Sequence, residues 1–225
     1  MKRFRIVIVD DHPIVRQGLE QLLEQEPDMK VSGAVGDAQD FMDLIKKEVP
    51  DIALVDLSLK NSSGLELIKD LAVQYPELKV LVISLHDEES YAERAIRAGA
   101  RGFIMKVEAT ENLLMAIRRV IKGEIYLSEK MKTRLLEKII SQKKPEPGGL
   151  LTDGLTDREI EIFDLIGEGM KNQNIANKLS ISIKTVETYK THLKRKLNLK
   201  DSSELIQKAV EWNLTENYLR ERNQN

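Results

Sequence analysis

The amino-terminal half of the chain alternates short apolar runs with longer stretches in which apolar residues recur every three or four positions. Short runs rich in Val and Ile are typical of buried strands, and the longer period is typical of helices. The predicted strands are 4–9, 29–35, 51–56, 79–84 and 101–105, and the helices that follow them are 14–25, 40–48, 64–75, 89–99 and 111–123. This alternation predicts a doubly wound α/β domain with a five-stranded parallel sheet and helices on both faces.

The strand pattern stops after Gly123. A helical stretch at 127–140 runs into SQKKPEPGGLLTDG, whose prolines and glycines predict a linker. From Thr156 onward only helical patterns follow, and Thr156 with Glu159 fits a reciprocal capping box at the first of them. The expected organisation is an α/β domain at 1–125, a linker with a helical segment at 126–150, and an all-α domain of about four helices at 151–225.

Composition narrows the class of protein. Of the 225 residues, 41% are apolar and 32% are charged, and no run approaches the roughly 20 apolar residues of a membrane span. The start MKRFRIVIVDD has too short an apolar run for a signal peptide. The absence of cysteine excludes disulfides, thiolate metal sites and thiol catalysis. We therefore expect a cytoplasmic protein that does not bind membranes.

Polar side chains follow four of the predicted strands at their carboxyl ends. Asp10 and Asp11 follow the first strand, Asp56 ends the third, Ser84 ends the fourth and Lys106 follows the fifth. Because ligands of an open parallel sheet bind at the carboxyl ends of its strands, we expect these groups to meet. Alone, a pair of aspartates after a strand is more often a helix cap. Their arrival at one edge with three other polar groups favours a site.

Such a set of groups suits phosphoryl chemistry. Three neighbouring carboxylates repel one another unless a cation enters, and Mg²⁺ prefers oxygen ligands. With the ion bound, Asp56 could attack a phosphoryl group as a carboxylate nucleophile. Lys106 and Ser84 could then contact the phosphoryl oxygens.

The motifs DDHPIVRQGL, LVDLSL and VISLHDEESYAERAIRAGARGFIMK resemble the receiver domain of bacterial response regulators, over residues 3 to 123. The resemblance implies a flavodoxin-like fold and Asp56 as the phosphoacceptor. It also implies that Ser84 and Phe103 form a switch, in which phosphorylation draws Ser84 toward the phosphate and lets Phe103 turn inward. The Mg²⁺ ligands that it implies are Asp10, Asp11, Asp56 and the backbone carbonyl of Ser58, with Ser84 and Lys106 at the phosphoryl group.

Three positions depart from the common receiver pattern. Lys60 replaces a frequent proline, Phe103 replaces a frequent tyrosine, and Leu85 is bulky where a small residue is frequent. Losing the proline frees the backbone at Lys60 and could loosen the loop before the third helix. We hypothesise that Leu85 narrows access to Asp56 and slows both phosphorylation and hydrolysis.

The carboxyl-terminal half carries its charge unevenly. Between Met170 and Lys200 there are eight Lys or Arg and one acid, Glu187. A local basic stretch is expected for nucleic acid binding, although a solvated helix face is the usual alternative. Here apolar residues at Ile175 and Val186 allow two helices to pack across a short turn with the lysines outward, which predicts a helix-turn-helix.

The segment from Leu155 to Val210 resembles the LuxR-type helix-turn-helix output domain, and the whole chain is similar to NarL/FixJ-family response regulators. Asn174 stands where Glu is frequent and Tyr189 where His is frequent. The resemblance implies a recognition helix at about 183–197 that binds double-stranded promoter DNA. Residues expected at base edges are Glu187, Thr188 and Thr191, and those expected near phosphates are Lys184, Thr185, Lys190 and Lys194.

The resulting hypothesis is a transcription factor, not an enzyme. A sensor histidine kinase would phosphorylate Asp56, and the change would drive homodimer formation or release of the recognition helix. Leu205, Ala209 and Trp212 form either the dimer face or the core of their own domain. Two alternatives are a DNA-binding regulator that works without phosphate, using a receiver-like dimerisation domain, and a Mg²⁺-dependent aspartyl-phosphate phosphatase. The phosphatase is disfavoured because DDH stands where a DxD motif is required.

Overall fold

The structure is a computed structural model that describes residues 3–59, 62–141, 154–179 and 181–222. The chain divides into two compact units, Met1–Leu136 and Glu137–Asn225, which are described separately. Lys60 and most of the Pro- and Gly-containing linker lie outside the described residues. None of the described helices is both long enough and apolar enough to cross a membrane.

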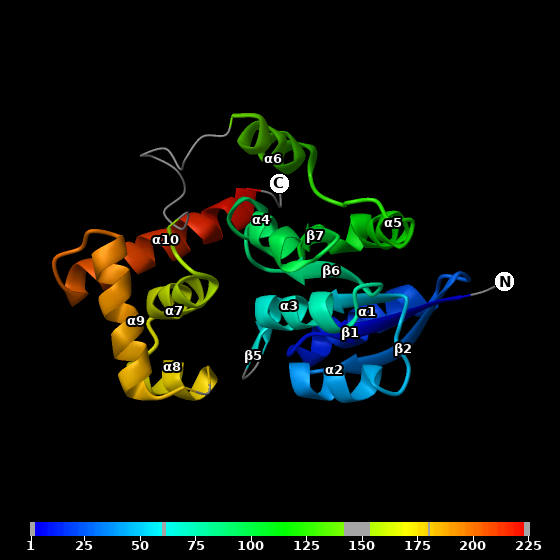
Figure 1. The fold of residues 1–225 in the computed structure, drawn as a ribbon, viewed down its shortest axis with the longest axis horizontal. Helices are drawn as coiled ribbons and strands as arrows, with labels where there is room; N and C mark the ends of the chain where they lie inside the picture. The colour runs from blue at the N-terminus through cyan, green and yellow to red at the C-terminus, as the bar shows by residue number, and fades with distance from the viewer. Residues whose placement is uncertain (1–2, 60–61, 142–153, 180, 223–225) are drawn as a thin grey trace. The chain divides into compact units, whose positions relative to one another are not determined.

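A five-stranded parallel sheet forms the centre of the first unit (Figure 1). Its spatial order is β2-β1-β3-β6-β7, and every neighbouring pair is parallel. This is the flavodoxin-like order with a strand reversal between β1 and β3, so the predicted fold class is confirmed. The five strands are β1 (Phe4–Val9), β2 (Met29–Val35), β3 (Ile52–Val55), β6 (Lys79–Ser84) and β7 (Gly102–Met105).

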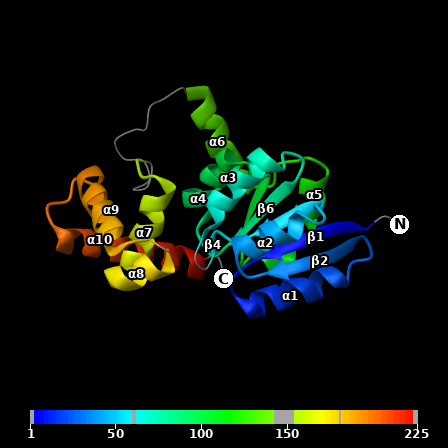
Figure 2. The same cartoon turned by 60° about the horizontal axis from the view of Figure 1, so that its bottom comes forward.

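Five helices pack on the two faces of this sheet (Figures 1 and 2). Pro13 begins the first helix, where its missing N–H costs little. Asp87 caps α4 by accepting from the Ser90 N–H. Side chains of successive residues of β1 point to opposite faces of the sheet. Ile6 and Ile8 lie in the core that α1 and α5 cover. The helices are α1 (Pro13–Glu24), α2 (Ala38–Ile45), α3 (Gly64–Gln74), α4 (Glu88–Ala98) and α5 (Ala109–Ile121).

Two features of the first unit were not predicted. A short antiparallel hairpin of β4 (Ser58–Leu59) and β5 (Ser62–Ser63) follows Asp56 directly. The second feature lies at β7, the edge strand of the sheet, where the chain beyond α5 runs alongside it. The Phe103 N–H donates to the Tyr126 carbonyl (2.9 Å), and the Tyr126 N–H donates to the Arg101 carbonyl (3.0 Å).

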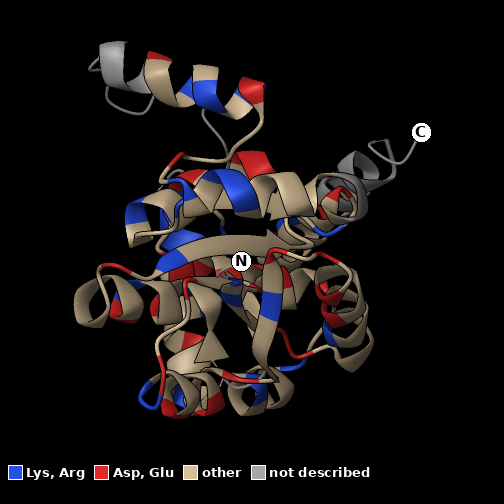
Figure 3. Cartoon of the chain, turned by 90° about the vertical axis from the view of Figure 1, so that its right-hand side faces the viewer, with Lys and Arg blue, Asp and Glu red and all other residues tan. Residues whose placement is uncertain are grey.

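The helix α6 (Glu129–Ser141) is tied to the start of α4. Glu89 on α4 forms ion pairs with both Lys130 and Arg134 on α6. Just before α6, the Ser128 N–H donates to the Glu88 carboxylate (2.8 Å). Figure 3 shows charges of both signs along α6. The segment from Tyr126 to Arg134, called the linker anchor below, is therefore bound to two places on the first unit.

The second unit is built of helices throughout its described residues. Thr156 and Glu159 form the predicted capping box at the start of α7. A Cβ atom on Gly167 would lie 2.4 Å from the Ala209 carbonyl oxygen, so glycine is what allows α7 and α10 to approach closely. The helices are α7 (Asp157–Gly167), α8 (Asn172–Lys178), α9 (Ile183–Lys196) and α10 (Ser202–Arg222).

Leu205, Ala209 and Trp212 lie on α10 of this unit. Leu205 and Ala209 are fully buried, and the Trp212 indole N–H donates to the Asp164 carboxylate on α7 (2.7 Å). Of the two interpretations left open by the sequence, the structure supports the core for Leu205 and Ala209, which are not available as a dimer face, whereas Trp212 is half-buried.

Candidate functional site

The carboxyl ends of the central strands meet at one edge of the sheet. The Asp56 N–H donates to the Val9 carbonyl (2.8 Å), which holds the end of β3 beside the end of β1. The Lys106 N–H donates to the Ser84 carbonyl (2.7 Å) and does the same for β7 and β6. The first of these bonds lies between β1 and β3, where the strand order reverses, and this is the usual ligand position in such sheets.

Gly64, at the start of α3, lies against the backbone of Asp56. A Cβ atom at that position would lie 2.2 Å from the Asp56 carbonyl oxygen. Any larger residue at the start of α3 would therefore displace the backbone that presents the Asp56 side chain.

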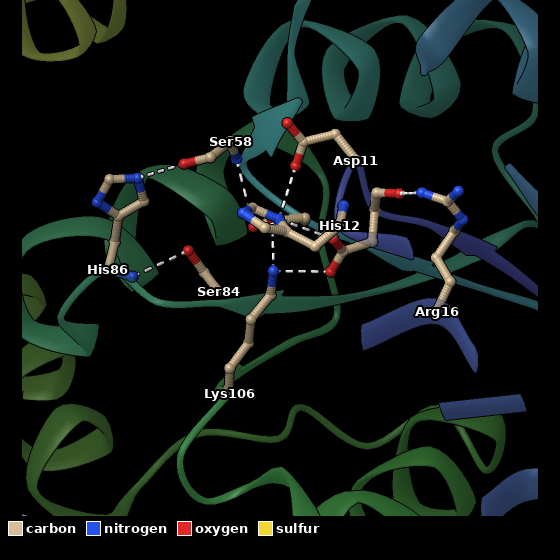
Figure 4. Close-up of polar contacts among 9 residues, drawn as sticks. Asp11, His12, Arg16, Ser58, Ser84, His86 and Lys106 are labelled. Carbon is tan, nitrogen blue, oxygen red and sulfur yellow. Dashed lines mark hydrogen bonds and ion pairs between the residues drawn. The ribbon is translucent and has the colours of Figure 1, made fainter. Parts of the chain in front are cut away.

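Lys106 bridges two of the predicted carboxylates. Its ammonium lies 2.7 Å from Asp10 Oδ2 and 2.7 Å from Asp56 Oδ2. Asp10 and Asp56 are 2% and 3% exposed, so water can compensate little of their charge. Figure 4 shows Lys106 reaching toward the group that also contains Asp11 and His12. One buried ammonium thus serves two buried carboxylates, with a third beside them.

The pKa values at the site reflect this shortage of positive charge. Burial raises the pKa of Asp56 to about 6, although Lys106 partly opposes the rise. Burial alone would lower the pKa of Lys106, but the carboxylates of Asp56 and Asp10 raise it above its usual value. Asp56 is therefore a carboxylate that additional positive charge would stabilise.

The carboxylates at this edge fit a divalent cation. Ligand atoms of Asp10, Asp11, His12 and Asp56 all lie within 4.8 Å of one another. Asp11 Oδ1 is buried and lies 2.7 Å from His12 Nδ1, so a carboxylate and an imidazole face one another at this edge. The hard oxygen donors match the preference of Mg²⁺. His12 was not singled out from the sequence, where it reads only as the residue before a helix-starting proline.

Ser58 and His86 extend the site away from the carboxylates. The Ser58 N–H donates to Asp56 Oδ1 (3.3 Å), and its hydroxyl lies 2.8 Å from His86 Nε2. The His86 N–H in turn donates to the Ser84 hydroxyl (3.1 Å), and its ring stacks on Tyr91. Figure 4 shows Ser58, His86 and Ser84 in this order. His86 carries no periodic or spacing signal by which it could have been identified from the sequence.

The switch residues differ in part from expectation. Ser84 is fully buried at the edge, beside the other polar groups. Phe103 is 1% exposed, so it already holds the inward position that we expected only after phosphorylation. Leu85 is 44% exposed, which places it at the surface next to Ser84. Its proposed effect on access to Asp56 stays a prediction.

In the second unit, α8 and α9 pack together with a polar outer face. Val186 and Leu193 of α9 are fully buried against the unit. The Thr188 and Thr191 hydroxyls donate to the backbone carbonyls four residues earlier, and the Lys190 ammonium donates to the Asn172 side chain (3.1 Å). Of the residues expected to contact DNA, the exposed ones are Lys184, Glu187, Thr188 and Thr191, and the partly buried ones are Thr185, Lys190 and Lys194.

One lysine of the basic stretch forms an ion pair within its own domain. The Lys196 ammonium lies 2.6 Å from the carboxylate of Glu159, which is 2% exposed. Burial alone would raise the pKa of Glu159, but hydrogen bonds from Lys196 and Thr156 lower it below its usual value. Lys196 therefore ties the end of α9 to the start of α7.

Both halves of the chain match families of known proteins. Residues 6–118 match the response regulator receiver domain, and residues 153–209 match the bacterial regulatory proteins of the luxR family. The oxygen regulatory protein NreC of Staphylococcus epidermidis is 36% identical over 94% of this chain and 99% of its own length. NreC of Staphylococcus aureus strain JH9 is 39% identical over the same shares.

Solved structures of the response regulator RcsB are also similar. RcsB of Salmonella typhimurium matches with a TM-score of 0.70 and 27% identity, over 94% of this chain and 98% of that one. A structure of RcsB from Salmonella enterica serovar Typhimurium bound to promoter rprA, with the phosphomimetic BeF3-, matches with a TM-score of 0.65 and 27% identity, over 92% and 98%.

Proposed function

Because the chain belongs to the NarL/FixJ family of response regulators, with a receiver domain and a LuxR-type DNA-binding domain, we propose that phosphorylation of Asp56 controls its binding to promoter DNA. The observation that carries this proposal is the state of Asp56 itself. It is buried at the reversal edge of the sheet, its pKa is raised to about 6, and it shares one lysine with another carboxylate.

The proposed chemistry is transfer of a phosphoryl group from a phosphohistidine of a sensor kinase. An Asp56 oxygen attacks phosphorus, an O–P bond forms, the N–P bond breaks, and the released imidazole nitrogen takes a proton. With a pKa of about 6, Asp56 is largely ionised and able to attack at neutral pH. Lys106, already 2.7 Å from Asp56, stays beside the phosphoryl oxygens and offsets their charge, and the Ser84 hydroxyl donates to one of them.

The cation of the site is proposed to be Mg²⁺. Asp10, Asp11, Asp56 and the Ser58 carbonyl would hold it, and the ligand atoms of the three carboxylates, which lie within 4.8 Å of one another, support this assignment. When bound, the ion supplies positive charge next to the phosphoryl oxygens. The carboxylates and Lys106 alone leave that charge incompletely balanced.

The linker anchor is the proposed route from the site to the DNA-binding domain. The Ser84 hydroxyl is bonded to the loop that leads into α4, and Glu88 and Glu89 at the start of α4 hold the linker anchor. Tyr126 is bonded to the backbone of Phe103 on the neighbouring strand. Movement of Ser84 toward a phosphoryl group would therefore reach α6 through both contacts.

The proposed partners follow from α9 and from the relatives. RcsB structures contain promoter DNA, and one has two RcsB dimers on two parallel DNAs. We extend this to the present chain, as a homodimer on double-stranded promoter DNA with the exposed face of α9 in the major groove. A cytoplasmic location follows from a DNA partner. Within this proposal the chain catalyses no reaction on another substrate.

A second candidate is DNA binding that does not need phosphate. The inward Phe103 favours it, because that side chain already occupies the position assigned to the activated form. The complete acidic set and Lys106 favour the phosphorylated switch, since a receiver that has lost phosphorylation has no need of them.

Mass spectrometry of the intact protein tests the proposal. The chain is incubated with Mg²⁺ and acetyl phosphate, and we expect one phosphoryl group on the wild type and none on Asp56→Asn. The matched control is Asp51→Asn, because Asp51 precedes the opposite end of the same strand and accepts from the Arg5 N–H (2.7 Å). An unmodified wild type, or equal modification of Asp56→Asn, would contradict the proposal.

A further inference from the structure

His12 lies among the acidic residues but has no part in the proposed phosphoryl transfer. Its Nδ1 is 2.7 Å from Asp11 Oδ1 and 3.1 Å from Asp10 Oδ1. The side chain is 51% exposed. Figure 4 shows His12 beside Asp11.

The backbone holds His12 in this position. Its N–H donates to Asp10 Oδ1 (2.8 Å), and it is the residue directly before the helix that starts at Pro13. The Arg16 side chain donates to the Asp10 carbonyl and fixes the preceding peptide. A side chain placed by backbone contacts on both sides is well suited to act as a ligand, because little freedom is lost on binding.

The distances from Nδ1 match those between neighbouring ligands of one ion. Octahedral ligands about 2.1 Å from a metal lie about 3 Å from their neighbours. The two Nδ1-to-oxygen distances, 2.7 and 3.1 Å, are hydrogen-bond or ion-pair contacts that a bound ion would replace, and they bracket this value; all four ligand atoms of the cluster lie within 4.8 Å. The imidazole nitrogen thus stands where a further ligand of the ion held by Asp11 would stand.

The type of ligand then decides which ion binds more tightly. Imidazole is a weak ligand for Mg²⁺, whereas divalent transition metals bind nitrogen donors more strongly. We propose that His12 Nδ1 is a direct metal ligand, and that it makes this site select a divalent transition metal such as Mn²⁺ over Mg²⁺. The inference rests on the metal site of the proposed function and adds to it a ligand and a preference.

The nearest alternative is that His12 acts only through charge or hydrogen bonding. As a protonated imidazole it would oppose every cation equally, so its removal would change the Mg²⁺ and Mn²⁺ affinities by the same factor. As a ligand it contributes to Mn²⁺ alone. The ratio of the two affinities therefore separates the interpretations.

The test uses the full chain with Mn²⁺ as the probe. Electron spin echo modulation detects a ¹⁴N nucleus bound to Mn²⁺, and we expect this modulation in the wild type and its loss in His12→Ala. The chain has three histidines, so His86→Ala and His192→Ala complete the control set and should keep the modulation. Calorimetry should show Mn²⁺ affinity falling about tenfold in His12→Ala, with Mg²⁺ affinity within about twofold.

The outcomes separate this inference from the proposed function. Mn²⁺ that binds in competition with Mg²⁺ but shows no nitrogen modulation would overturn His12 as a ligand and leave the carboxylate site intact. Equal changes in both affinities would overturn the selectivity. Absence of any Mn²⁺ or Mg²⁺ binding that depends on Asp11 would overturn the metal site itself, and the inference with it.

Discussion

Asp56 in the receiver domain and Glu159 in the DNA-binding domain are both buried carboxylates paired with a lysine. Their exposures are 3% and 2%, and their distances to the ammonium are 2.7 and 2.6 Å. Their pKa values nevertheless move in opposite directions, since that of Asp56 is raised to about 6 and that of Glu159 is lowered. Burial raises the pKa of both carboxylates, but it prevails at Asp56 and is outweighed by hydrogen bonds at Glu159.

The remaining contacts explain the difference. Glu159 also accepts from the Thr156 N–H (2.7 Å) and the Thr156 hydroxyl (3.0 Å). Asp56 shares its lysine with Asp10 and otherwise accepts the Ser58 N–H at 3.3 Å. A carboxylate whose hydrogen-bonding capacity is filled stabilises the fold, whereas one left short of positive charge is ready for a cation and a phosphoryl group.

The largest expected change in stability comes from substituting Glu159. Glu159→Gln should lower the free energy of unfolding of the DNA-binding domain by about 2–3 kcal/mol, because it leaves Lys196 without its partner. Trp212, the single tryptophan, is bonded to Asp164 within this domain, so its fluorescence in a urea titration reports the change. The control is Glu161→Gln, whose carboxylate is more exposed than that of Glu159 and whose pair with Arg158 should contribute below about 1 kcal/mol. Equal losses in both variants would undo the comparison.

Asp56→Asn should change the free energy of unfolding in the opposite direction, by stabilising its domain. In buffer with a chelator at neutral pH, we expect it to raise the free energy of unfolding of the receiver by about 1–2 kcal/mol, since it removes a charge whose burial is unfavourable. Scanning calorimetry measures this, and added Mg²⁺ should stabilise the wild type more than the variant. A destabilised variant would show that Lys106 already balances Asp56.

Much of this site could be predicted from the sequence, because periodicity determines where strands end. The positions of Asp10, Asp56, Ser84 and Lys106 at one edge follow from strand ends alone, and so does the sheet. The pairing of Glu159 with Lys196 could not be predicted. The capping box is local in sequence, whereas Lys196 arrives from α9 through packing that no local pattern describes.

Contacts of loops were missed for the same reason. His12 and His86 take their places from the turns after β1 and β6, and single residues in turns carry no periodic signal. The linker anchor was predicted only as a helical stretch near a linker. Its attachment depends on Glu89 of α4, which is far from it in sequence, and on Tyr126 lying beside β7.

The pH dependence should separate the two carboxylates. The pKa of Asp56 in the folded chain, about 6, exceeds its ordinary value of 3.8, so the unfavourable contribution of its charge is fully present above pH 6 and shrinks as the pH falls from about 6 to about 3.8. The stability gap between wild type and Asp56→Asn should therefore close over this range. The pKa of Glu159 is lowered, so its stabilising contribution should persist until the pH falls below about 4.5. Thermal unfolding from pH 7 to 5 checks both, and a gap for Asp56→Asn that does not change would contradict its assignment.

The smallest expected effect concerns communication between the domains. Glu89→Gln removes the partner of Lys130 and Arg134 and should reduce the effect of phosphorylation on DNA affinity by about threefold, because exposed ion pairs contribute below about 1 kcal/mol. The control is Glu93→Gln on the same helix, where Glu93 pairs with Arg97 within α4. Fluorescence anisotropy with promoter DNA measures both, and identical behaviour of the two variants would exclude the linker anchor as the route.

The central claim is that the poorly compensated Asp56 controls the DNA-binding domain. The most direct test is DNA affinity of the full chain before and after treatment with acetyl phosphate and Mg²⁺, with the phosphorylated fraction and the oligomeric state measured in the same samples. We predict that phosphorylation raises the affinity of the wild type about tenfold and leaves Asp56→Asn unchanged. A wild type that is fully phosphorylated, with unchanged DNA affinity and unchanged oligomeric state, would contradict the account.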